Sequence, residues 1–185
     1  MLKKRKRATE NIKSMTIAAM LTAMSVVIGI LCKNFLNFGG GLFRVTFENL
    51  PIIMGGLLFG PVIGGIIGAA SDLLSYLFSA QIYPPNLIVT VGAISVGVVS
   101  GVMSKYVVRK KGKGQIIISG GLAHIVGSMI IKPIGLFQFY SWAVLFRIPL
   151  YFVIAPLEII LICVLFSRKS FSRIVGYTNS DKEKI

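Results

Sequence analysis

The chain has 185 residues, of which 55% are hydrophobic and only 14% are charged. This balance excludes an ordinary soluble domain and is typical of a membrane protein. The net charge of +14 would also suit a nucleic-acid-binding protein, but sixteen of the 20 Lys and Arg residues lie in three patches beside long apolar runs. Cytoplasmic Lys and Arg of membrane proteins have this distribution, so membrane topology explains the charge better than nucleic acid does.

Four apolar runs, at residues 15–32, 87–108, 115–131 and 142–166, have about the length that a membrane-spanning helix needs. A fifth run, at residues 50–77, contains the helix-breaking step Gly60-Pro61. If this run crossed the membrane once, the basic patches would lie on opposite sides. If it is a hairpin, all of them lie on one side, as the positive-inside principle requires.

We therefore predict an all-α integral membrane protein with six transmembrane helices, both termini in the cytoplasm, and short second and third helices that turn at Gly60-Pro61. Residues 1–14 form a basic cytoplasmic segment, residues 15–166 a single membrane domain, and residues 167–185 a basic cytoplasmic tail. No small-x-small cleavage site ends the first apolar run, so we interpret it as a retained helix. Cys32 and Cys163 lie in apolar runs, which indicates neither a disulfide nor a metal site.

Small residues recur at intervals of four along two of the predicted helices. Gly60, Gly64 and Gly68 share one helix face, and Ala19 and Ala23 repeat the spacing in the first helix. Such residues let helix backbones approach closely in lipid, either within the chain or against a partner protein.

Charged residues outside the basic patches are the first candidates for a binding site, because an unpaired charge at the bilayer centre costs about 2.5–3.5 kcal/mol on insertion scales. For three of them a structural role is the alternative. Asp72 would pair with an arginine, Lys132 would extend to the outer headgroups, and Glu158 would stabilise helix packing or a contact with a partner protein. The candidates in or beside apolar helices are Lys33, Arg44, Lys132, Arg147, Glu48, Asp72 and Glu158.

Aromatic and amide side chains gather on the predicted outer side of the membrane. They fit either an interfacial aromatic belt or a cavity for a flat, partly polar ring. The residues concerned are Phe43, Phe47, Tyr83, Asn86, Phe137, Gln138, Phe139, Tyr140 and Trp142.

No catalytic or nucleotide-binding motif is present in the sequence. His124 is the only histidine, and no Gly-x-Ser-x-Gly motif accompanies it, so we expect a buried, hydrogen-bonded histidine and no catalytic residues. A Walker A motif is also missing. Any energy that the chain needs must therefore come from elsewhere, and we expect no cofactor.

Several segments carry a resemblance to a known family. Residues 44–51 read Arg-Val-Thr-Phe-Glu-Asn-Leu-Pro, residues 56–61 read Gly-Leu-Leu-Phe-Gly-Pro, and residues 71–74 read Ser-Asp-Leu-Leu. With Tyr-Pro-Pro-Asn at 83–86 and Ala-Pro-Leu-Glu at 155–158, they resemble the substrate-binding S components of energy-coupling factor (ECF) vitamin transporters, most of all the folate family. The resemblance extends from about residue 16 to residue 166.

The resemblance implies a non-enzymatic subunit of the bacterial plasma membrane that binds folate with high affinity on the outside. It implies delivery of the vitamin together with a transmembrane T component and two cytoplasmic ATPases. In such families an Ala-x-x-x-Ala pair on the first helix contacts the T component, and Ala19 and Ala23 match that pair.

Folate chemistry calls for aromatic walls, an acid or amide at the pterin edge, and Lys or Arg at the dicarboxylate tail. We expect Arg44, Lys132 or Arg147 at the tail and Glu48, Asp72, Asn86 or Gln138 at the pterin, with Phe47, Tyr83, Tyr140 and Trp142 as aromatic walls. Another vitamin such as thiamine, riboflavin or pantothenate stays open, because a scaffold does not fix its ligand. A stand-alone secondary transporter or a small intramembrane enzyme is the alternative from a different class.

Overall fold

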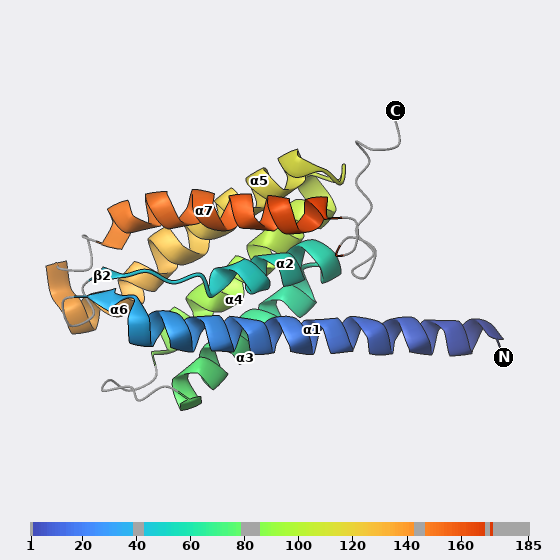
Figure 1. Cartoon of the computed structure of the whole chain (residues 1–185), viewed down its shortest axis with the longest axis horizontal. Coiled ribbons are helices and arrows are strands. Elements are labelled where there is room, and N and C mark those ends of the chain that lie inside the picture. The colour runs from blue at the N-terminus through green and yellow to red at the C-terminus, as the bar shows by residue number, and fades with distance from the viewer. Residues whose placement is uncertain (1, 39–42, 79–85, 143–146, 169–170, 172–185) are drawn as a thin grey trace.

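The structure is a computed structural model that describes residues 2–38, 43–78, 86–142, 147–168 and 171. Positions 2–10, 37–38, 43–44, 138–140 and 147–148 are described by their backbone alone. Within these residues the chain forms six helical rods and one short β-hairpin (Figure 1). The predicted all-α fold of six helices is confirmed.

The rods follow one another in chain order, and two of them contain a π-helical stretch, labelled η. They are α1 (Leu2–Phe35), α2 (Asn49–Phe59), α3 (Pro61–Phe78), α4 (Leu87–Val102) continuing into η1 (Met103–Val107), α5 (Lys113–Ala123) continuing through η2 (His124–Ile131) into α6 (Lys132–Tyr140), and α7 (Arg147–Ser167). Strands β1 (Asn37–Phe38) and β2 (Phe43–Arg44) pair antiparallel between α1 and α2.

The break between α2 and α3 lies at the predicted position. Gly60 has φ 87°, a conformation that glycine adopts without steric cost, and its N–H donates to the carbonyl of Gly56 at 2.9 Å. Pro61 then begins α3, where its missing N–H leaves no hydrogen bond unmade. The two arms are unequal, with 11 residues in α2 and 18 in α3.

By length and composition, five of the rods are able to cross a membrane, and α2 is the short exception. At 1.5 Å per residue α2 extends only about 16 Å, roughly half of a bilayer core. Its residues from Asn49 to Leu57 are all buried, and it packs against α1, α3, α4, α5 and α7. A helix that is apolar on all sides is typically enclosed in this way.

The predicted glycine face packs inside the chain, against α4. A Cβ atom on Gly64 would lie 2.5 Å from the carbonyl oxygen of Gly97, so only glycine allows this contact. Ala19 and Ala23, by contrast, are exposed on α1. Close approach of backbones without side chains between them is how small residues hold helices together in lipid.

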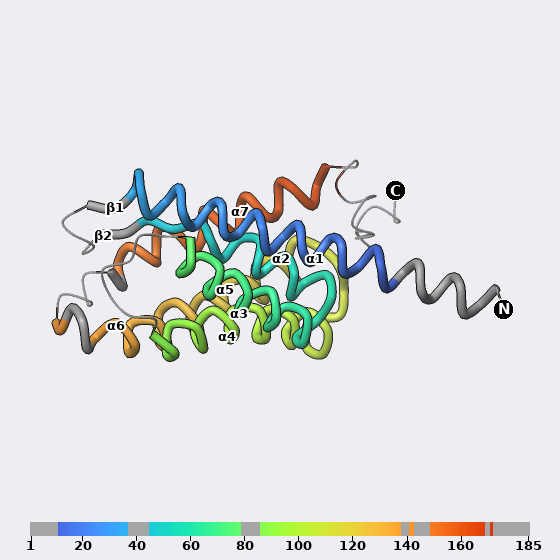
Figure 2. The backbone as a smooth tube through the Cα atoms, turned by 90° about the horizontal axis from the view of Figure 1, so that it is seen from below, coloured from blue at the N-terminus to red at the C-terminus, as the bar shows by residue number. Residues whose placement is uncertain are grey.

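The arrangement of the helix ends agrees with the hairpin topology. The start of α1, the turn between α4 and α5, and the end of α7 lie at one end of the bundle, and the β-hairpin lies at the other (Figures 1 and 2). The first two basic patches and Arg168 of the third belong to the first of these ends. That this end is cytoplasmic stays a prediction.

Candidate functional site

A small polar pocket lies where α1, α3 and α4 surround the beginning of α2. It holds about 190 Å³ of space between atoms, open solvent included. Ser25 is ten residues before the end of α1, or about 15 Å from the β-hairpin end of the bundle. The lining residues are Ser25, Glu48, Ile52, Ser71, Asp72, Ser75 and Ala93.

Glu48, at the entrance to α2, is paired with a lysine from the other side of the bundle. The Lys132 ammonium nitrogen lies 3.3 Å from Oε1 of Glu48 and donates to Oδ1 of Asn49 at 2.8 Å. Asn49 in turn donates to the Ser128 hydroxyl at 3.3 Å. Lys132 is only 5% exposed, which is inconsistent with the expectation that it reaches the outer headgroups.

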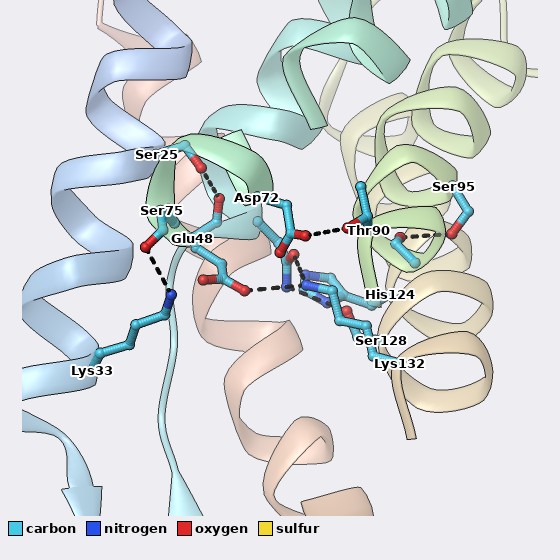
Figure 3. Close-up of polar contacts among 12 residues, drawn as sticks. Ser25, Lys33, Glu48, Asp72, Ser75, Thr90, Ser95, His124, Ser128 and Lys132 are labelled. Atoms are coloured by element: carbon cyan, nitrogen blue, oxygen red, sulfur yellow. Dashed lines mark hydrogen bonds and ion pairs between the residues drawn. The ribbon is translucent and has the colours of Figure 1, made fainter. Parts of the chain in front are cut away.

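Asp72 is held by a residue of the neighbouring helix. The Thr90 hydroxyl of α4 donates to Oδ2 of Asp72 at 2.7 Å. Figure 3 shows Glu48, Asp72 and Lys132 converging on a common space from three different parts of the bundle. All three were predicted as ligand contacts, and that role stays a prediction.

Serine side chains and a second lysine complete the surroundings of the pocket. The Ser25 hydroxyl donates to the backbone carbonyl of Glu48 at 2.7 Å, and the Lys33 ammonium group donates to the carbonyl of Ser75 at 3.3 Å (Figure 3). Ser71 is 3% exposed, and its hydroxyl has no hydrogen-bond partner among the described residues. Buried polar groups rarely lack a hydrogen-bond partner, so this hydroxyl is a candidate contact for a ligand or a water molecule.

A second acid–base pair lies outside the pocket. Nε2 of His124, at the start of η2, lies 2.6 Å from Oε2 of Glu158 in α7. Both side chains are fully enclosed by protein. This pair matches the expectation of a buried histidine and of Glu158 as a helix-packing group, and neither residue lines the pocket.

Asn86 has a structural task in addition to any contact with a ligand. Its side-chain oxygen accepts from the N–H of Ile88 at 2.9 Å and caps α4, while its amide nitrogen donates to the carbonyl of Gly135. An N-cap of this type stabilises a helix start by about 1 kcal/mol. The side chain is therefore bonded at both ends within the protein.

The predicted aromatic residues are only partly described. Phe47 is half-buried beside Glu48. Trp142 is 73% exposed and contacts the ring of Phe137 edge-on at a centroid distance of 5.6 Å. Tyr83 lies outside the described residues, as do the side chains of Arg44, Gln138, Tyr140 and Arg147.

Reasoning from charge missed the neutral polar members of the site. A signal for two of them was available, because Ser71 and Ser75 are four residues apart and share a helix face beside Asp72. Asn49, Thr90 and Ser128 had no such signal. The whole set that charge did not reveal is Ser25, Asn49, Ser71, Ser75, Thr90 and Ser128.

The chemistry of the site is that of binding by hydrogen bonds. Among the described residues no group of three or more His, Cys, Asp and Glu side chains is placed to hold a metal ion. The pocket instead offers two carboxylates and three hydroxyls between apolar side chains. Ligand pockets commonly have this composition, a mostly apolar wall with a few placed polar groups.

The chain is similar to known proteins in three comparisons. The family model described as "ECF transporter, substrate-specific component" matches residues 13–178. The folate transporter FolT of Clostridium novyi is 34% identical over 79 residues, which are 41% of this chain and 46% of that protein. An uncharacterized MG098 homolog of Mycoplasma pneumoniae is 30% identical over 95 residues, 51% of this chain and 19% of that protein.

These alignments span less than half of each relative. Among solved structures, a crystal structure of FolT bound with folic acid superposes with a TM-score of 0.62 at 23% identity, covering 82% of this chain and 89% of that one. At this identity the superposition shows a shared fold.

Proposed function

The chain belongs to the family of substrate-specific components of ECF transporters, and from this premise we propose that it is the folate-binding component of an ATP-driven vitamin uptake transporter. As a member of that family it is a multi-pass bacterial membrane protein and a substrate-binding transport subunit, not an enzyme. The observation that carries the proposal is the polar pocket among apolar helices, with Glu48, Asp72 and the hydroxyl of Ser71 on its walls.

Folate as the substrate is supported by similarity and by chemistry. A relative named for folate transport and a structure holding folic acid are both similar to this chain. Folate combines a flat ring rich in N–H donors with an apolar middle and a dicarboxylate tail. The pocket offers acceptors for the first part, and Ile52 and Ala93 offer apolar surface.

The proposed site is larger than the pocket alone. Ligand pockets usually have volumes of about 300–1,000 Å³, whereas the cavity here measures about 10 Å³, room for about one water molecule. We assign the remainder of the ligand to the side facing the β-hairpin, where the backbone of Arg44 lies. The aromatic residues Phe47, Tyr83, Tyr140 and Trp142 stay candidates for its walls.

The proposed partners are a transmembrane T component and two cytoplasmic ATPases. The sequence has no Walker A motif, so this chain does not bind ATP by that route. The proposal assigns ATP hydrolysis to the two ATPase subunits. Ala19 and Ala23 are exposed on α1 beside Met15 and Met20, which are 73% and 67% exposed. A face of small and flexible apolar side chains suits a helix of a partner protein.

Calorimetry of the detergent-purified chain tests the substrate. Folate added without ATP or partner subunits is expected to bind with a stoichiometry of one per chain. Thiamine, riboflavin and pantothenate, titrated in parallel, are expected to release no heat of binding. A monodisperse sample that bound one of these vitamins and not folate would contradict the folate assignment while leaving the family unaffected.

A further inference from the structure

The turn between η1 and α5 carries five cations within nine residues, and all five side chains are exposed. The sequence has no Asp or Glu between Asp72 and Glu158. Glu48 and Asp72 line the pocket, and Glu158 is enclosed with His124. Residues 105–113, the basic turn, therefore form a surface of positive charge only, made by Lys105, Arg109, Lys110, Lys111 and Lys113.

Buried hydrogen bonds hold the basic turn in place. The side-chain amide of Gln115, which is 3% exposed, donates to the carbonyl oxygens of Ser104 at 2.9 Å and of Val108 at 2.8 Å. The Ser104 hydroxyl donates to the carbonyl oxygen of Leu57, near the end of α2, at 3.2 Å. These bonds connect α5, η1 and α2 around the turn, so less conformational entropy is lost when a ligand binds to its cations.

Apolar side chains lie next to the basic turn on both of the helices that it joins. Tyr106 and Val107 in η1 are 56% and 61% exposed, and Ile117 and Ile118 in α5 are 52% and 45% exposed. η1 and α5 belong to rods that are long and apolar enough to cross a membrane, so these side chains face lipid chains and the turn lies at the level of the lipid headgroups. The Lys105 ammonium group lies 5.7 Å from the centre of the Tyr106 ring, an arrangement that suits a helix end at the membrane surface.

The headgroup of a phospholipid decides how well it fits this surface. Every phospholipid places a phosphate group above its acyl chains, which is the order of cations and apolar side chains at the basic turn. Phosphatidylcholine carries a cation beyond its phosphate, and the cations of the turn repel it. Phosphatidylglycerol has no such cation, and one Lys or Arg near a membrane surface strengthens the binding of an anionic lipid by about fivefold.

We propose that the basic turn is a binding site for an anionic phospholipid of the phosphatidylglycerol class. Arg109, Lys110 and Lys113 bind the headgroup phosphate, to which a guanidinium group can donate two parallel hydrogen bonds. The acyl chains lie along Val107 and Ile117. The site is separate from the pocket at the start of α2, so the inference goes beyond the proposed function and holds whichever vitamin the chain binds.

Thermal unfolding of the full-length protein in detergent micelles, with lipid titrated in, tests this site. A ligand that binds the folded protein raises the midpoint of unfolding according to its concentration relative to its Kd. Dioleoyl phosphatidylglycerol is expected to reach a given rise at a mole fraction at least about tenfold lower than dioleoyl phosphatidylcholine. Raising the NaCl concentration from about 0.05 M to about 0.5 M should reduce this difference, because salt screens exposed charges.

The variant Arg109→Gln/Lys110→Gln/Lys113→Gln removes three charges from the turn. It should need about 10–100-fold more phosphatidylglycerol than the wild type for the same rise in midpoint. If this variant is not recovered as a monodisperse protein, Arg109→Gln alone takes its place, with an expected loss of about fivefold.

The matched control is Lys4→Gln/Arg5→Gln/Lys6→Gln in the first basic patch. It removes the same number of charges, but residues 4–6 lie more than one helical turn before the span that begins at Asn11. Its phosphatidylglycerol dependence should stay within about twofold of the wild type, because charges outside the headgroup level are screened.

Two further outcomes would overturn the site. Equal losses in the two triple variants would show a general effect of net charge, and equal midpoints in the two lipids would remove the preference for an anionic headgroup. Glycerol 3-phosphate distinguishes a lipid from a free anion, since it carries the phosphate without acyl chains. If about 1 mM of it raised the midpoint as phosphatidylglycerol does, the turn would be an anion site and the proposed lipid contact would be wrong. None of these measurements requires folate, so their failure and that of the proposed function are distinguishable.

Discussion

Two acid–base pairs join helices inside the bundle, and they differ in what else can reach them. His124 and Glu158 are 2.6 Å apart, with side chains 1% and 0% exposed. Lys132 and Glu48 are 3.3 Å apart, with side chains 6% and 18% exposed, and Glu48 lines the pocket. Both pairs place ionisable groups among apolar helices, so a charge within the membrane does not by itself mark a binding site.

The comparison assigns different tasks to the two pairs. The closed pair joins η2 to α7, and both of its side chains are enclosed by protein. The open pair joins the start of α2 to the junction of η2 and α6, and its glutamate presents an oxygen to the pocket. Substitutions in the closed pair are therefore expected to change stability, and substitutions in the open pair to change ligand binding as well.

The largest effect is expected from Glu158→Ala. Removing one partner of a buried pair typically costs about 3–5 kcal/mol, because the other partner stays buried without compensation. The midpoint of thermal unfolding in detergent should fall markedly, while the protein that remains folded should bind folate as the wild type does. Glu158→Gln, which keeps an acceptor for His124, is the matched control and should lose less stability. Equal stability of all three proteins would show that the pair contributes nothing.

A smaller effect, but one on binding, is expected from Lys132→Met. This change keeps the length of the side chain and removes the ammonium group that lies 3.3 Å from the half-buried Glu48 carboxylate, which should weaken folate binding by about 10–100-fold in calorimetry. Adding Glu48→Gln should restore much of the loss, because a neutral amide at this position does not need the ammonium group.

The same variant tests the alternative role of Lys132 as a contact for the folate tail. In that case Lys132→Met would weaken folate binding and leave pterin binding unchanged, and Glu48→Gln would restore nothing. Such a result would contradict the assignment of Lys132 to Glu48.

The smallest effect is expected from Gly92→Ala in α4. A Cβ atom there would lie 2.6 Å from Cγ of Lys132. The lysine side chain must then shift, although its contacts with Glu48 and Asn49 hold it in place. We expect a loss of folate affinity of about fivefold, together with about 1 kcal/mol of stability. Gly121→Ala is the matched control, because a Cβ atom at Gly121 meets no atom within 4 Å. Similar affinities of the two variants would separate the Lys132 position from ligand binding.

The sequence alone was sufficient for the helices and for the break between the second and third. Apolar runs and the Gly60-Pro61 step are local features, and they act on the backbone within a few residues. The cost of a charge in lipid pointed to Glu48, Asp72 and Lys132, but it pointed equally to Glu158, which lies outside the pocket.

The pairing of these residues was decided only by the tertiary structure. Lys132 lies 84 positions from Glu48 and 83 from Asn49 along the chain, and no local pattern connects residues so far apart. The same holds for Thr90 and Asp72, which meet because α3 and α4 pack face to face through their glycines. Asn86, a predicted ligand contact, caps α4 and bonds to Gly135, a contact that depends on where the rod of α5, η2 and α6 passes.

The sequence thus determined which residues must leave the lipid, because the free energy of transferring a charge depends on residue type and depth. Helix packing determined where they went. α2 is too short to span the membrane and is enclosed by its neighbours, which brings the start of this helix, with Glu48 and Asn49, to the middle of the bundle. The pocket exists because a short helix begins there, and its depth is set by the rods around it.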